Sequence, residues 1–281
     1  MAKVLIVGCG DVGSRLAVEL AAAGHTVHGL RRQPFALPGV RMLAGDVTVP
    51  ATLKFPGGLE YVFVLLAPGE SGEAAYRRVY YEGTKNVLAA LAGQSLRRLF
   101  WISSSSVYGQ DDGSEVDETS PAQPATATAR VLLESEQLLR TGVWPATVVR
   151  LSGIYGSGRL RLLDWVRAGR PVQADPVQWT NRIHAADAAG LLAFLMAQDR
   201  DGVMLADTYL GTDSAPAPQH EVLDWLAERL QLPRVPRETK PGAGRNKRLR
   251  NARLLGLGYR LRYPDYRAGY AAMLAEGADK S

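Results

Sequence analysis

The sequence is poor in cysteine and lacks any long uninterrupted hydrophobic segment. With Cys9 as the only cysteine, an internal disulfide and a zinc site built on several cysteines are both excluded. No apolar run reaches the roughly 18–20 residues that a membrane-spanning helix needs. The short apolar start of the chain, soon broken by glycines, is typical of a buried strand and not of a signal peptide. We therefore expect a cytoplasmic protein in a reducing compartment, with no membrane partner.

Aromatic residues are also few, at 7% of the chain, but hydrophobic residues make up 46% and charged residues 22%. These proportions are those of a globular protein, and they exclude disorder, collagen-like repeats and a coiled coil. A length of 281 residues suits one large α/β unit that carries a smaller appendage.

Positive charge is concentrated towards the C-terminal end. The chain has a net charge of +5, yet residues 229–267 contain twelve Lys and Arg residues and only two acidic ones. A basic segment can bind anionic metabolites or nucleic acid, or it can be a solvated surface. Nucleic-acid binding would need interleaved aromatic residues or a recognised module, and neither is present. We therefore expect no nucleic-acid partner.

Short aliphatic segments alternate with helical patterns over the first half of the chain. Strands are predicted at residues 3–7, 26–30, 41–43, 61–66, 98–103, 146–151 and 203–210. Helices are predicted at residues 11–23, 73–92, 126–140, 184–196, 221–230 and 266–275. Strands joined by long helical connections imply right-handed crossovers and a parallel sheet. The predicted fold class is α/β, with a Rossmann doubly wound sheet in the order 3-2-1-4-5-6.

A glycine motif follows the first predicted strand directly and opens the first helix. It reads G-x-G-x-x-G, with Gly8, Gly10 and Gly13 as the glycines and Asp11 and Val12 between the last two. In this setting the first glycine makes a tight turn, the second lets the backbone approach a diphosphate, and the third lets helix and strand pack closely. The motif predicts a dinucleotide site formed by these five residues, and the alternative is a glycine-rich turn without a ligand.

The end of the second predicted strand favours one form of the dinucleotide. NAD sites usually place a carboxylate there for the ribose 2′-hydroxyl, whereas this chain has Arg31 and Arg32. Guanidinium–phosphate pairs are worth about 1.5–3 kcal/mol each, so we expect NADP, with NAD less favoured, unless the two arginines are only surface charges. Asp46 either accepts from the adenine amino group or begins a turn, and Ala67 is a further predicted cofactor contact.

Four segments give the chain a family resemblance. They are Ser103–Gly109 (SSSSVYG), Asp117–Pro121 (DETSP), Arg150–Gly158 (RLSGIYGSG) and Asn181–Asp187 (NRIHAAD). With the glycine loop, they resemble the extended short-chain dehydrogenase/reductase superfamily, in its NAD-dependent epimerase/dehydratase-like branch. The resemblance implies a nicotinamide-dependent reaction at a carbon that bears oxygen, and it is compatible with a homodimer. It does not specify a substrate.

One departure from the family pattern concerns catalysis. The family's Tyr-x-x-x-Lys pair would fall on Thr126 and Arg130, and the helix that follows contains neither a tyrosine nor a lysine. A threonine hydroxyl is too weak an acid to replace a tyrosinate near pH 7. With helical spacing, Arg130 would lie on the face of Thr126 and could hold the nicotinamide ribose. The resemblance places a catalytic hydroxyl at Ser104, with Ser105 as the adjacent alternative.

Another group would then have to move the proton. The candidates are Tyr108, Tyr155, Glu118 and His184. Of these, His184 titrates near pH 6.5 in the absence of other effects, but a residue at a helix start more commonly caps or packs.

The basic segment also matches the family's C-terminal pattern. Residues 245–259, beginning with Arg245 and including Lys247 and Arg248, resemble a segment in which basic residues often face the diphosphate of a nucleotide sugar. The alternative is a solvated basic face. Within the same region, the Arg-, Pro- and Gly-rich stretch 233–250 is predicted to be an exposed loop.

These observations predict two domains. Residues 1–151 form the NADP-binding Rossmann domain, to which residues 183–210 return, and residues 152–182 and 211–281 form a substrate-binding lobe. We expect an oxidoreductase or epimerase-like enzyme acting on a small or nucleotide-linked polar substrate. The alternative is a catalytically silent redox sensor that binds NADP(H) and reports to a partner.

Overall fold

The computed structural model describes residues 1–240 and 246–278, which divide into two compact units. The first unit comprises Met1–Val107, Pro124–Arg150 and Ala189–Tyr209, and the second comprises Tyr108–Gln123, Leu151–Ala188 and Leu210–Ser281. The segment Tyr108–Gln123, which we had assigned to the Rossmann domain from the sequence, clusters with the second unit.

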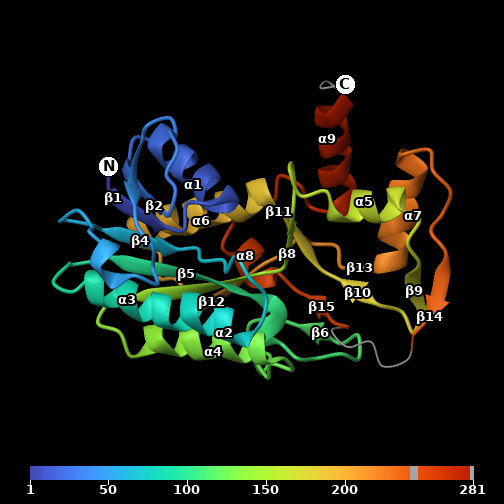
Figure 1. The fold of residues 1–281 in the computed structure, drawn as a ribbon, viewed down its shortest axis with the longest axis horizontal. Helices are drawn as coiled ribbons and strands as arrows, with labels where there is room; N and C mark the ends of the chain where they lie inside the picture. Colours follow the sequence, from blue (N-terminus) through green and yellow to red (C-terminus); the bar gives the residue numbers. More distant parts are fainter. Residues whose placement is uncertain (241–245, 279–281) are drawn as a thin grey trace. The chain divides into compact units, whose positions relative to one another are not determined.

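A seven-stranded sheet forms the centre of the first unit (Figure 1). Its strands are β1 (Lys3–Val7), β2 (Thr26–Arg31), β3 (Val40–Ala44), β4 (Tyr61–Val64), β5 (Arg98–Ser104), β7 (Ala146–Leu151) and β12 (Thr208–Gly211). They lie in the order β3-β2-β1-β4-β5-β7-β12, and the pairs from β3 to β5 are parallel. The predicted fold class and the order 3-2-1-4-5-6 are confirmed, with β12 added beside the sixth strand.

Helices cover both faces of this sheet. They are α1 (Asp11–Ala22), α2 (Glu73–Tyr76), a π-helix η2 (Arg77–Glu82), α3 (Gly83–Ala90), α4 (Ala127–Arg140) and α6 (Ala185–Arg200), with 3₁₀ turns η1 (Pro50–Thr52) and η3 (Ser105–Val107). Figure 1 shows α1 and α6 on one face, with α3 and α4 on the other. β1 and β4 are buried along nearly their whole length, as expected for strands of a doubly wound sheet.

The helix predicted over residues 73–92 is not a single α-helix. A π-helical segment at Arg77–Glu82 separates α2 from α3. π-Helical turns change the face that each side chain presents and often occur at functional sites. Ala75 and Val87 are buried, whereas Val79 is only partly buried.

The second unit consists of short paired strands and helices. The strands are β6 (Glu115–Val116), β8 (Gly153–Tyr155), β9 (Val172–Asp175), β10 (Trp179–Thr180), β11 (Arg182–His184), β13 (Ala217–Pro218), β14 (Arg237–Thr239) and β15 (Arg248–Leu249), paired as β6·β15, β8·β11, β9·β14 and β10·β13. The helices are α5 (Arg161–Arg167), α7 (Gln219–Arg229), α8 (Ala252–Gly256) and α9 (Tyr266–Ala278).

The exposed loop predicted at residues 233–250 is confirmed over most of residues 233–240, which are largely exposed, and wrong where two short strands and three buried residues occur. Strands β14 and β15 lie within it, and Val235, Lys247 and Leu249 are buried. The reason is that β14 and β15 pair with β9 and β6, which are distant in the sequence. The Pro, Gly and Arg residues of this stretch are typical of a loop, and local composition does not indicate pairing with distant strands.

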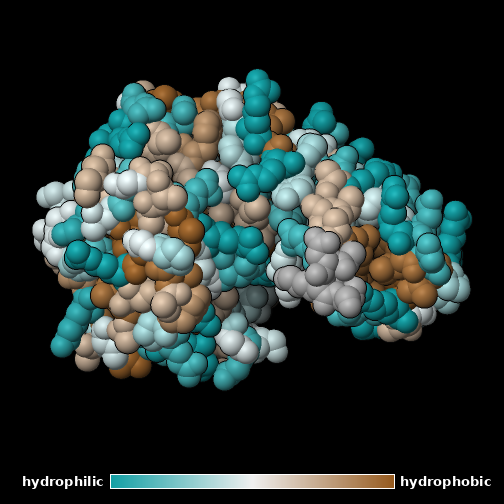
Figure 2. Space-filling model, turned by 90° about the horizontal axis from the view of Figure 1, so that it is seen from above, coloured by the Kyte–Doolittle hydropathy of each residue, from teal (hydrophilic) through white to brown (hydrophobic). Residues whose placement is uncertain are grey.

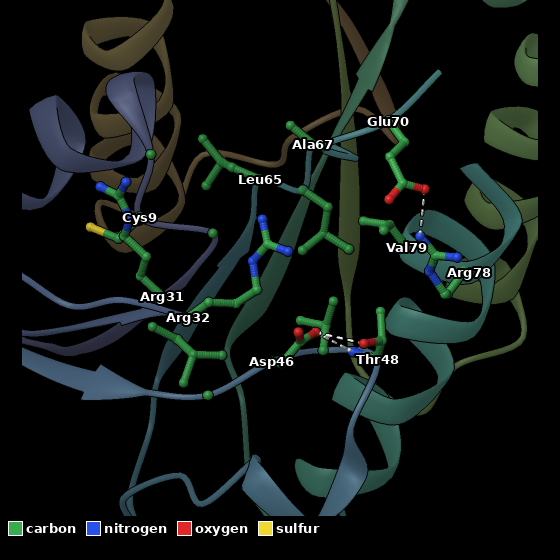
Figure 3. A pocket seen from close by; sticks show the side chains of 17 residues that line it. Cys9, Arg31, Arg32, Asp46, Thr48, Leu65, Ala67, Glu70, Arg78 and Val79 are labelled. Atoms are coloured by element: carbon green, nitrogen blue, oxygen red, sulfur yellow. Dashed lines mark hydrogen bonds and ion pairs between the residues drawn. The ribbon is translucent and has the colours of Figure 1, made fainter. Parts of the chain in front are cut away.

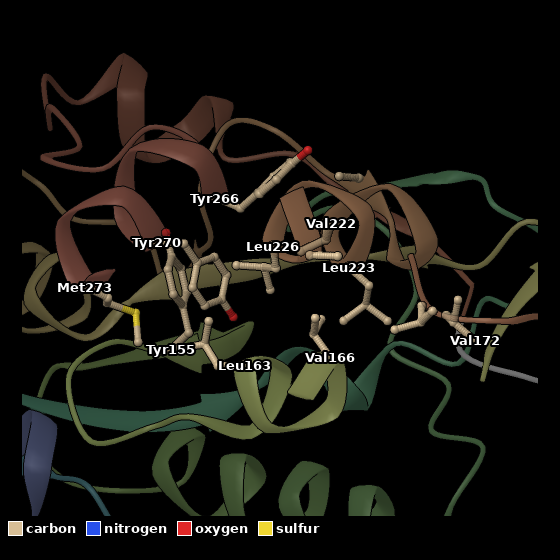
Figure 4. Close-up of a cluster of buried hydrophobic side chains, with 13 residues drawn as sticks. Tyr155, Leu163, Val166, Val172, Val222, Leu223, Leu226, Tyr266, Tyr270 and Met273 are labelled. Carbon is tan, nitrogen blue, oxygen red and sulfur yellow. The ribbon is translucent and has the colours of Figure 1, made fainter. Parts of the chain in front are cut away.

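The second unit has its own hydrophobic core (Figure 4). Tyr155 and Tyr270 stack with ring centroids 4.7 Å apart, and Leu226 and Val166 lie in the same cluster.

On the face shown in Figure 2, hydrophobic and hydrophilic residues are interspersed. Among residues 1–240 and 246–278, no helix has both the length and the apolar character needed to cross a bilayer.

A buried ion pair ties α4 to the sheet of the first unit. The Arg150 Nε and Nη2 atoms lie 3.0 and 2.6 Å from the two carboxylate oxygens of Glu136, and Ser103 Oγ donates to Glu136 Oε1 at 2.5 Å. The side chains of Glu136 and Arg150 are 1% and 5% exposed. The two charges therefore compensate each other at a buried site, where hydrogen bonds also stabilise them.

We predict that Glu136→Gln lowers the free energy of unfolding by about 3–5 kcal/mol, because it leaves the buried Arg150 guanidinium without a counter-charge. Urea denaturation followed by circular dichroism measures this loss. Glu134→Gln is the matched control on the same helix: Glu134 pairs with Arg77 at a half-exposed site, so its loss costs less than about 1 kcal/mol. Equal effects of the two substitutions would contradict the prediction.

Candidate functional site

The loop between β1 and α1 is held very close to a neighbouring strand. Gly8 has φ +92°, and a Cβ atom there would lie 2.0 Å from the carbonyl oxygen of Leu65. A Cβ atom on Gly13 would lie 2.6 Å from the Gly8 carbonyl oxygen. A Cβ atom on Gly10 would meet nothing within 4 Å. The first and third glycines are therefore required by packing, whereas Gly10 borders open space at the start of α1.

That open space belongs to a cavity of about 330 Å³ in the first unit (Figure 3). Its walls come from the glycine loop, the ends of β2 and β3, the segment after β4, and the π-helix. The lining residues are Gly8, Cys9, Gly10, Leu30, Arg31, Arg32, Gly45, Asp46, Val47, Thr48, Leu65, Leu66, Ala67, Gly69, Glu70, Arg78 and Val79. Of the predicted cofactor residues, Gly8, Gly10, Arg31, Arg32, Asp46 and Ala67 line this cavity.

The other predicted cofactor residues take different places. Asp11 and Val12 form the first turn of α1, and Gly13 packs against Gly8 without lining the cavity. Arg130 lies on α4, also outside the lining. The first-turn N–H groups of a helix have no partners within the helix and favour anions. The loop thus presents backbone donors beside open space.

The two arginines at the end of β2 point in different directions. The Arg31 guanidinium lies over the Phe35 ring, 4.8 Å from its centroid. The Arg32 side chain reaches into the cavity (Figure 3), and its Nη2 atom lies 3.9 Å from where a Gly69 Cβ would be. Arg32 is therefore the better placed of the two to bind an anion inside the cavity.

Asp46 is fixed by a short turn. Its Oδ1 atom accepts from the Thr48 backbone N–H at 2.9 Å and from the Thr48 hydroxyl at 2.8 Å. Partial burial acts to raise the pKa of Asp46, but these hydrogen bonds and the charges of Arg32 and Arg78 outweigh it, so the pKa lies below its ordinary value. Asp46 thus begins a turn, one of its two predicted roles, and also faces the cavity as a carboxylate.

The opposite wall contains residues that the sequence did not indicate. Arg78 and Glu70 form an ion pair with Arg78 Nη2 3.1 Å from Glu70 Oε2. Thr48 and Val79 also line the cavity. Nothing in the local pattern distinguishes these residues from surface charges or core positions, because the segments that carry them meet only in the folded chain.

The serines at the end of β5 form a turn of their own. Ser104 Oγ accepts from the Ser106 backbone N–H at 3.1 Å, and Ser105 begins the 3₁₀ turn η3. Both serines are partly buried. Their hydroxyl groups remain compatible with donation to a substrate oxygen, because Ser104 Oγ serves as an acceptor in this contact.

Thr126 and Arg130 lie at the start of α4. Thr126 has extended dihedral angles (φ −118°, ψ 152°) and is the N-cap, where its Oγ1 atom accepts from the Ala129 N–H at 3.3 Å. Its carbonyl oxygen accepts from the Arg130 N–H at 3.0 Å, and Arg130 is exposed in the first turn of the helix. The hydroxyl of Thr126 is therefore engaged in capping the helix that carries Arg130.

The remaining proton-transfer candidates hold segments of the second unit together. Glu118 Oε1 accepts from the Leu210 N–H at 2.8 Å, and His184 Nδ1 accepts from the Ala186 N–H at 3.2 Å. The Tyr155 hydroxyl donates to the Asp265 carbonyl oxygen at 3.3 Å, and burial raises its pKa far above the usual range. Tyr108 is 1% exposed.

The basic C-terminal segment bonds mainly to its own unit. The buried Lys247 donates to the Tyr108 carbonyl oxygen at 2.6 Å, and Arg248 donates to the Gly113 carbonyl oxygen at 2.9 Å. Arg250 pairs with Glu115. Arg245 lies outside the described residues. Lys247 and Arg248 thus each donate to a backbone carbonyl group, and the expectation that they face a diphosphate stays a prediction.

A second cavity, of about 520 Å³, lies within the second unit. It is lined by Gly153, Ile154, Tyr155, Arg159, Leu160, Arg161, Leu162, Thr180, Asn181, Arg182, Gln219 and Tyr270. Arg182 is 4% exposed; its Nη2 atom donates to the Thr180 hydroxyl, and its Nη1 atom has no hydrogen-bond partner. An unpaired buried guanidinium N–H is costly, and an anionic ligand would satisfy it.

In the described part of the chain, no group of His, Cys, Asp and Glu could hold a metal ion.

Comparison with known proteins identifies the family. The model of the NAD dependent epimerase/dehydratase family matches residues 4–204. The match covers well over half of the chain, and it includes the glycine loop and every strand from β1 to β11. The chain belongs to the NAD-dependent epimerase/dehydratase family, as the sequence motifs predicted.

Individual relatives agree over nearly the full length. A protein of Methylobacillus flagellatus, provisionally assigned to the NAD-dependent epimerases/dehydratases, has 40% identity and a TM-score of 0.84, with 99% of each chain covered. Protein YeeZ of Escherichia coli (strain K12) is 27% identical, with 94% of this chain and 97% of YeeZ covered. MoeE5 in complex with UDP-glucuronic acid and NAD has a TM-score of 0.82 at 23% identity, with 99% of this chain and 100% of the MoeE5 chain covered, and shows a shared fold.

We predict that Gly13→Ala destabilises the protein, by about 1–3 kcal/mol, because the new methyl group would overlap the Gly8 carbonyl oxygen. Gly10→Ala changes the free energy of unfolding by less than about 0.5 kcal/mol, since its Cβ meets open space. Denaturant unfolding of the two variants checks the difference. An equal loss of stability in both would show that the cavity beside Gly10 is closed.

A buried carboxyl group of the second unit generates a pH dependence. Asp213 is 1% exposed; its Oδ1 atom accepts from the Ala215 N–H at 3.2 Å, and its Oδ2 atom has no partner. Burial raises the pKa of Asp213 from 3.8 to about 7, although Arg182 opposes the shift. The unfolded chain releases this proton near pH 4, so the stabilising contribution of the neutral form is lost as pH rises towards 7.

We predict that Asp213→Asn becomes more stable relative to the wild type as the pH rises from 5 to 8, by on the order of a few kcal/mol. Asparagine keeps the acceptor for the Ala215 N–H and carries no charge. Urea unfolding at both pH values measures the effect, with the exposed Asp207→Asn as the control. A stability difference that does not change with pH would contradict the prediction.

Proposed function

We propose that this protein is an NADP-dependent oxidoreductase or epimerase that acts on a nucleotide-linked or other anionic polar substrate. The observation that carries the proposal is the cavity of the first unit, where a tightly packed glycine loop lies beside the arginines at the end of β2. Family membership supports the binding of a nicotinamide dinucleotide. The preference for NADP follows from Arg31 and Arg32, which stand where an NAD site has a carboxylate.

The cavity residues fit this cofactor. The backbone from Gly8 to Gly13 would hold the diphosphate, because Gly10 leaves the approach open and α1 begins there. Asp46 would accept from the adenine amino group through a carboxylate oxygen, and Arg32 would bind the 2′-phosphate, with Arg31 beside it. The bound cofactor supplies hydride transfer to or from a carbon that bears oxygen.

The second-unit cavity supports an anionic substrate. Arg182 contributes a buried guanidinium with an unpartnered N–H, and Arg159 and Arg161 lie at the same cavity. Guanidinium groups bind phosphate and carboxylate through paired hydrogen bonds. MoeE5, which shares the fold, forms a complex with UDP-glucuronic acid. A substrate bearing a phosphate or a carboxylate is thus consistent with both observations.

We also propose which side chains act at the reacting carbon of the substrate. The Ser104 hydroxyl would orient the substrate oxygen, with Ser105 as the adjacent donor and Tyr108 as a further candidate, and Arg130 would hold the nicotinamide ribose. Arg130 cannot act as a base, because its guanidinium stays protonated at physiological pH. Helix α4 contains neither a tyrosine nor a lysine.

A second candidate function follows from the same helix. The position expected for a catalytic tyrosine carries Thr126, and its hydroxyl is engaged in capping α4. A protein that retains the cofactor cavity without that acid–base pair would bind NADP(H) without turnover. It would then report the redox state of the pool to a partner.

The test begins with titration of NADPH and NADH by isothermal titration calorimetry. We expect NADPH to bind more tightly, and Arg32→Gln to weaken NADPH by about 10-fold or more with little effect on NADH, since one charge-assisted contact is worth about 1.5–3 kcal/mol. Gly10→Ala should weaken both nucleotides, because its methyl group enters the diphosphate approach. Arg41→Gln, an exposed position on β3 outside the cavity, is the control.

The second stage separates the two candidate functions. NADPH oxidation is followed by its absorbance with aldehydes, ketones and nucleotide sugars, and epimerisation of the sugars is followed by chromatography. Turnover supports the enzyme, whereas tight NADPH binding without any turnover supports the sensor. Failure to bind either nucleotide, or tighter binding of NADH, overturns the proposed cofactor.

A further inference from the structure

The wall of the first cavity opposite Arg32 carries a charged pair with no assigned role. Arg78 belongs to the π-helix Arg77–Glu82, and its Nη2 atom lies 3.1 Å from Glu70 Oε2. Both side chains line the cavity and are more than half exposed, at 55% and 73%. An ion pair this exposed contributes little to stability, typically less than about 1 kcal/mol. A contribution to the stability of the fold therefore does not explain why Arg78 and Glu70 are paired here.

Arg78 and the residue before it on the π-helix face different surfaces. Its neighbour Arg77 points elsewhere and pairs with Glu134 on α4, with Arg77 Nη2 2.9 Å from Glu134 Oε2. In the same short element, two consecutive arginines thus serve two different surfaces, and Val79 beside them also lines the cavity. Arg77 and Arg78 therefore form a matched pair for experiment.

Arg78 and Arg32 act on the same part of the cavity. Figure 3 shows Arg32 reaching in from the end of β2, with Arg78 on the far side and Asp46 on the wall between them. The charges of both arginines lower the pKa of Asp46. Arg31, Arg32 and Arg78 are the three arginines among the residues that line the cavity, and Asp46 and Glu70 are the two acidic ones.

We propose that Arg78 is a second specificity-determining residue for the 2′-phosphate of NADP, acting with Arg32 from the opposite wall, and that Glu70 restrains it. This inference rests on the proposed function. Phosphate carries up to two negative charges and three acceptor oxygens, so it competes effectively with one carboxylate for a guanidinium. On binding, Arg78 would exchange Glu70 for the phosphate. Arg32 and Arg78 would then bracket the ligand from two elements far apart in the sequence.

The test uses two small probes that differ in the 2′-phosphate, adenosine 2′,5′-diphosphate and adenosine 5′-monophosphate. Isothermal titration calorimetry measures their affinities for the full chain at low and at moderate salt. We expect Arg78→Gln to weaken the 2′,5′-diphosphate about 10-fold and the 5′-monophosphate less than about twofold. The preference for the 2′-phosphate should also depend less steeply on salt in this variant.

Two further variants complete the design. Glu70→Gln removes the competing carboxylate and should tighten the 2′,5′-diphosphate severalfold at low salt, leaving the 5′-monophosphate unchanged. Arg77→Gln removes the same charge from the adjacent position and should leave the ratio of the two affinities unchanged. Circular dichroism and thermal unfolding confirm that each variant is folded, as expected for exposed positions.

Three outcomes overturn the inference. The first is an affinity ratio in Arg78→Gln that equals the wild-type ratio, the second is an equal weakening of both probes by Arg78→Gln, and the third is an effect of Arg77→Gln that matches that of Arg78→Gln. If Arg32→Gln still lowers the affinity for the 2′,5′-diphosphate in those cases, only the role of Arg78 fails and the proposed cofactor stands. If the wild type shows no preference for the 2′-phosphate at all, the proposed NADP specificity fails together with this inference.

Discussion

The close approach of Gly8 to the backbone of Leu65 is the constraint on which the cavity of the first unit depends. A side chain at residue 8 would overlap the Leu65 carbonyl oxygen, so the loop can cross the end of the sheet only with glycine there. Gly13 then brings α1 against the same loop. The two contacts bring the start of a helix beside the ends of β1 and β4, where the N–H groups and the positive end of the helix face open space.

Around this backbone framework, three arginines and two acidic residues line the cavity. Arg31 and Arg32 come from the end of β2, while Arg78 comes from a π-helix that follows β4. The carboxylates of Asp46 and Glu70 offset part of the positive charge of these arginines, and the pKa of Asp46 lies below its ordinary value. Such a cavity favours an anion over a neutral hydroxyl, because each guanidinium gains most from a charged acceptor.

The second unit distributes its positive charge in another way. Lys247 and Arg248 bond to backbone carbonyl groups and fix the chain in which they lie, whereas Arg182 keeps an unpartnered N–H at a cavity. Asp187, buried at the start of α6, accepts from the backbone N–H groups of Arg262 and Tyr263 at 2.7 and 2.9 Å. Lys247, Arg248 and Asp187 thus hold segments of the second unit in place, whereas Arg182 lies at its cavity.

The sequence by itself determined the fold class, the order of the first six strands and the glycine loop, because aliphatic periodicity and glycine spacing are local properties. It also located Arg32 and Asp46, which directly follow predicted strands. Tertiary structure alone decided that Arg78 and Glu70 meet in the cavity and that Thr126 caps a helix. It also decided that Lys247 is buried. These outcomes depend on which distant segments pack together, and pairings across the fold leave no period in the chain.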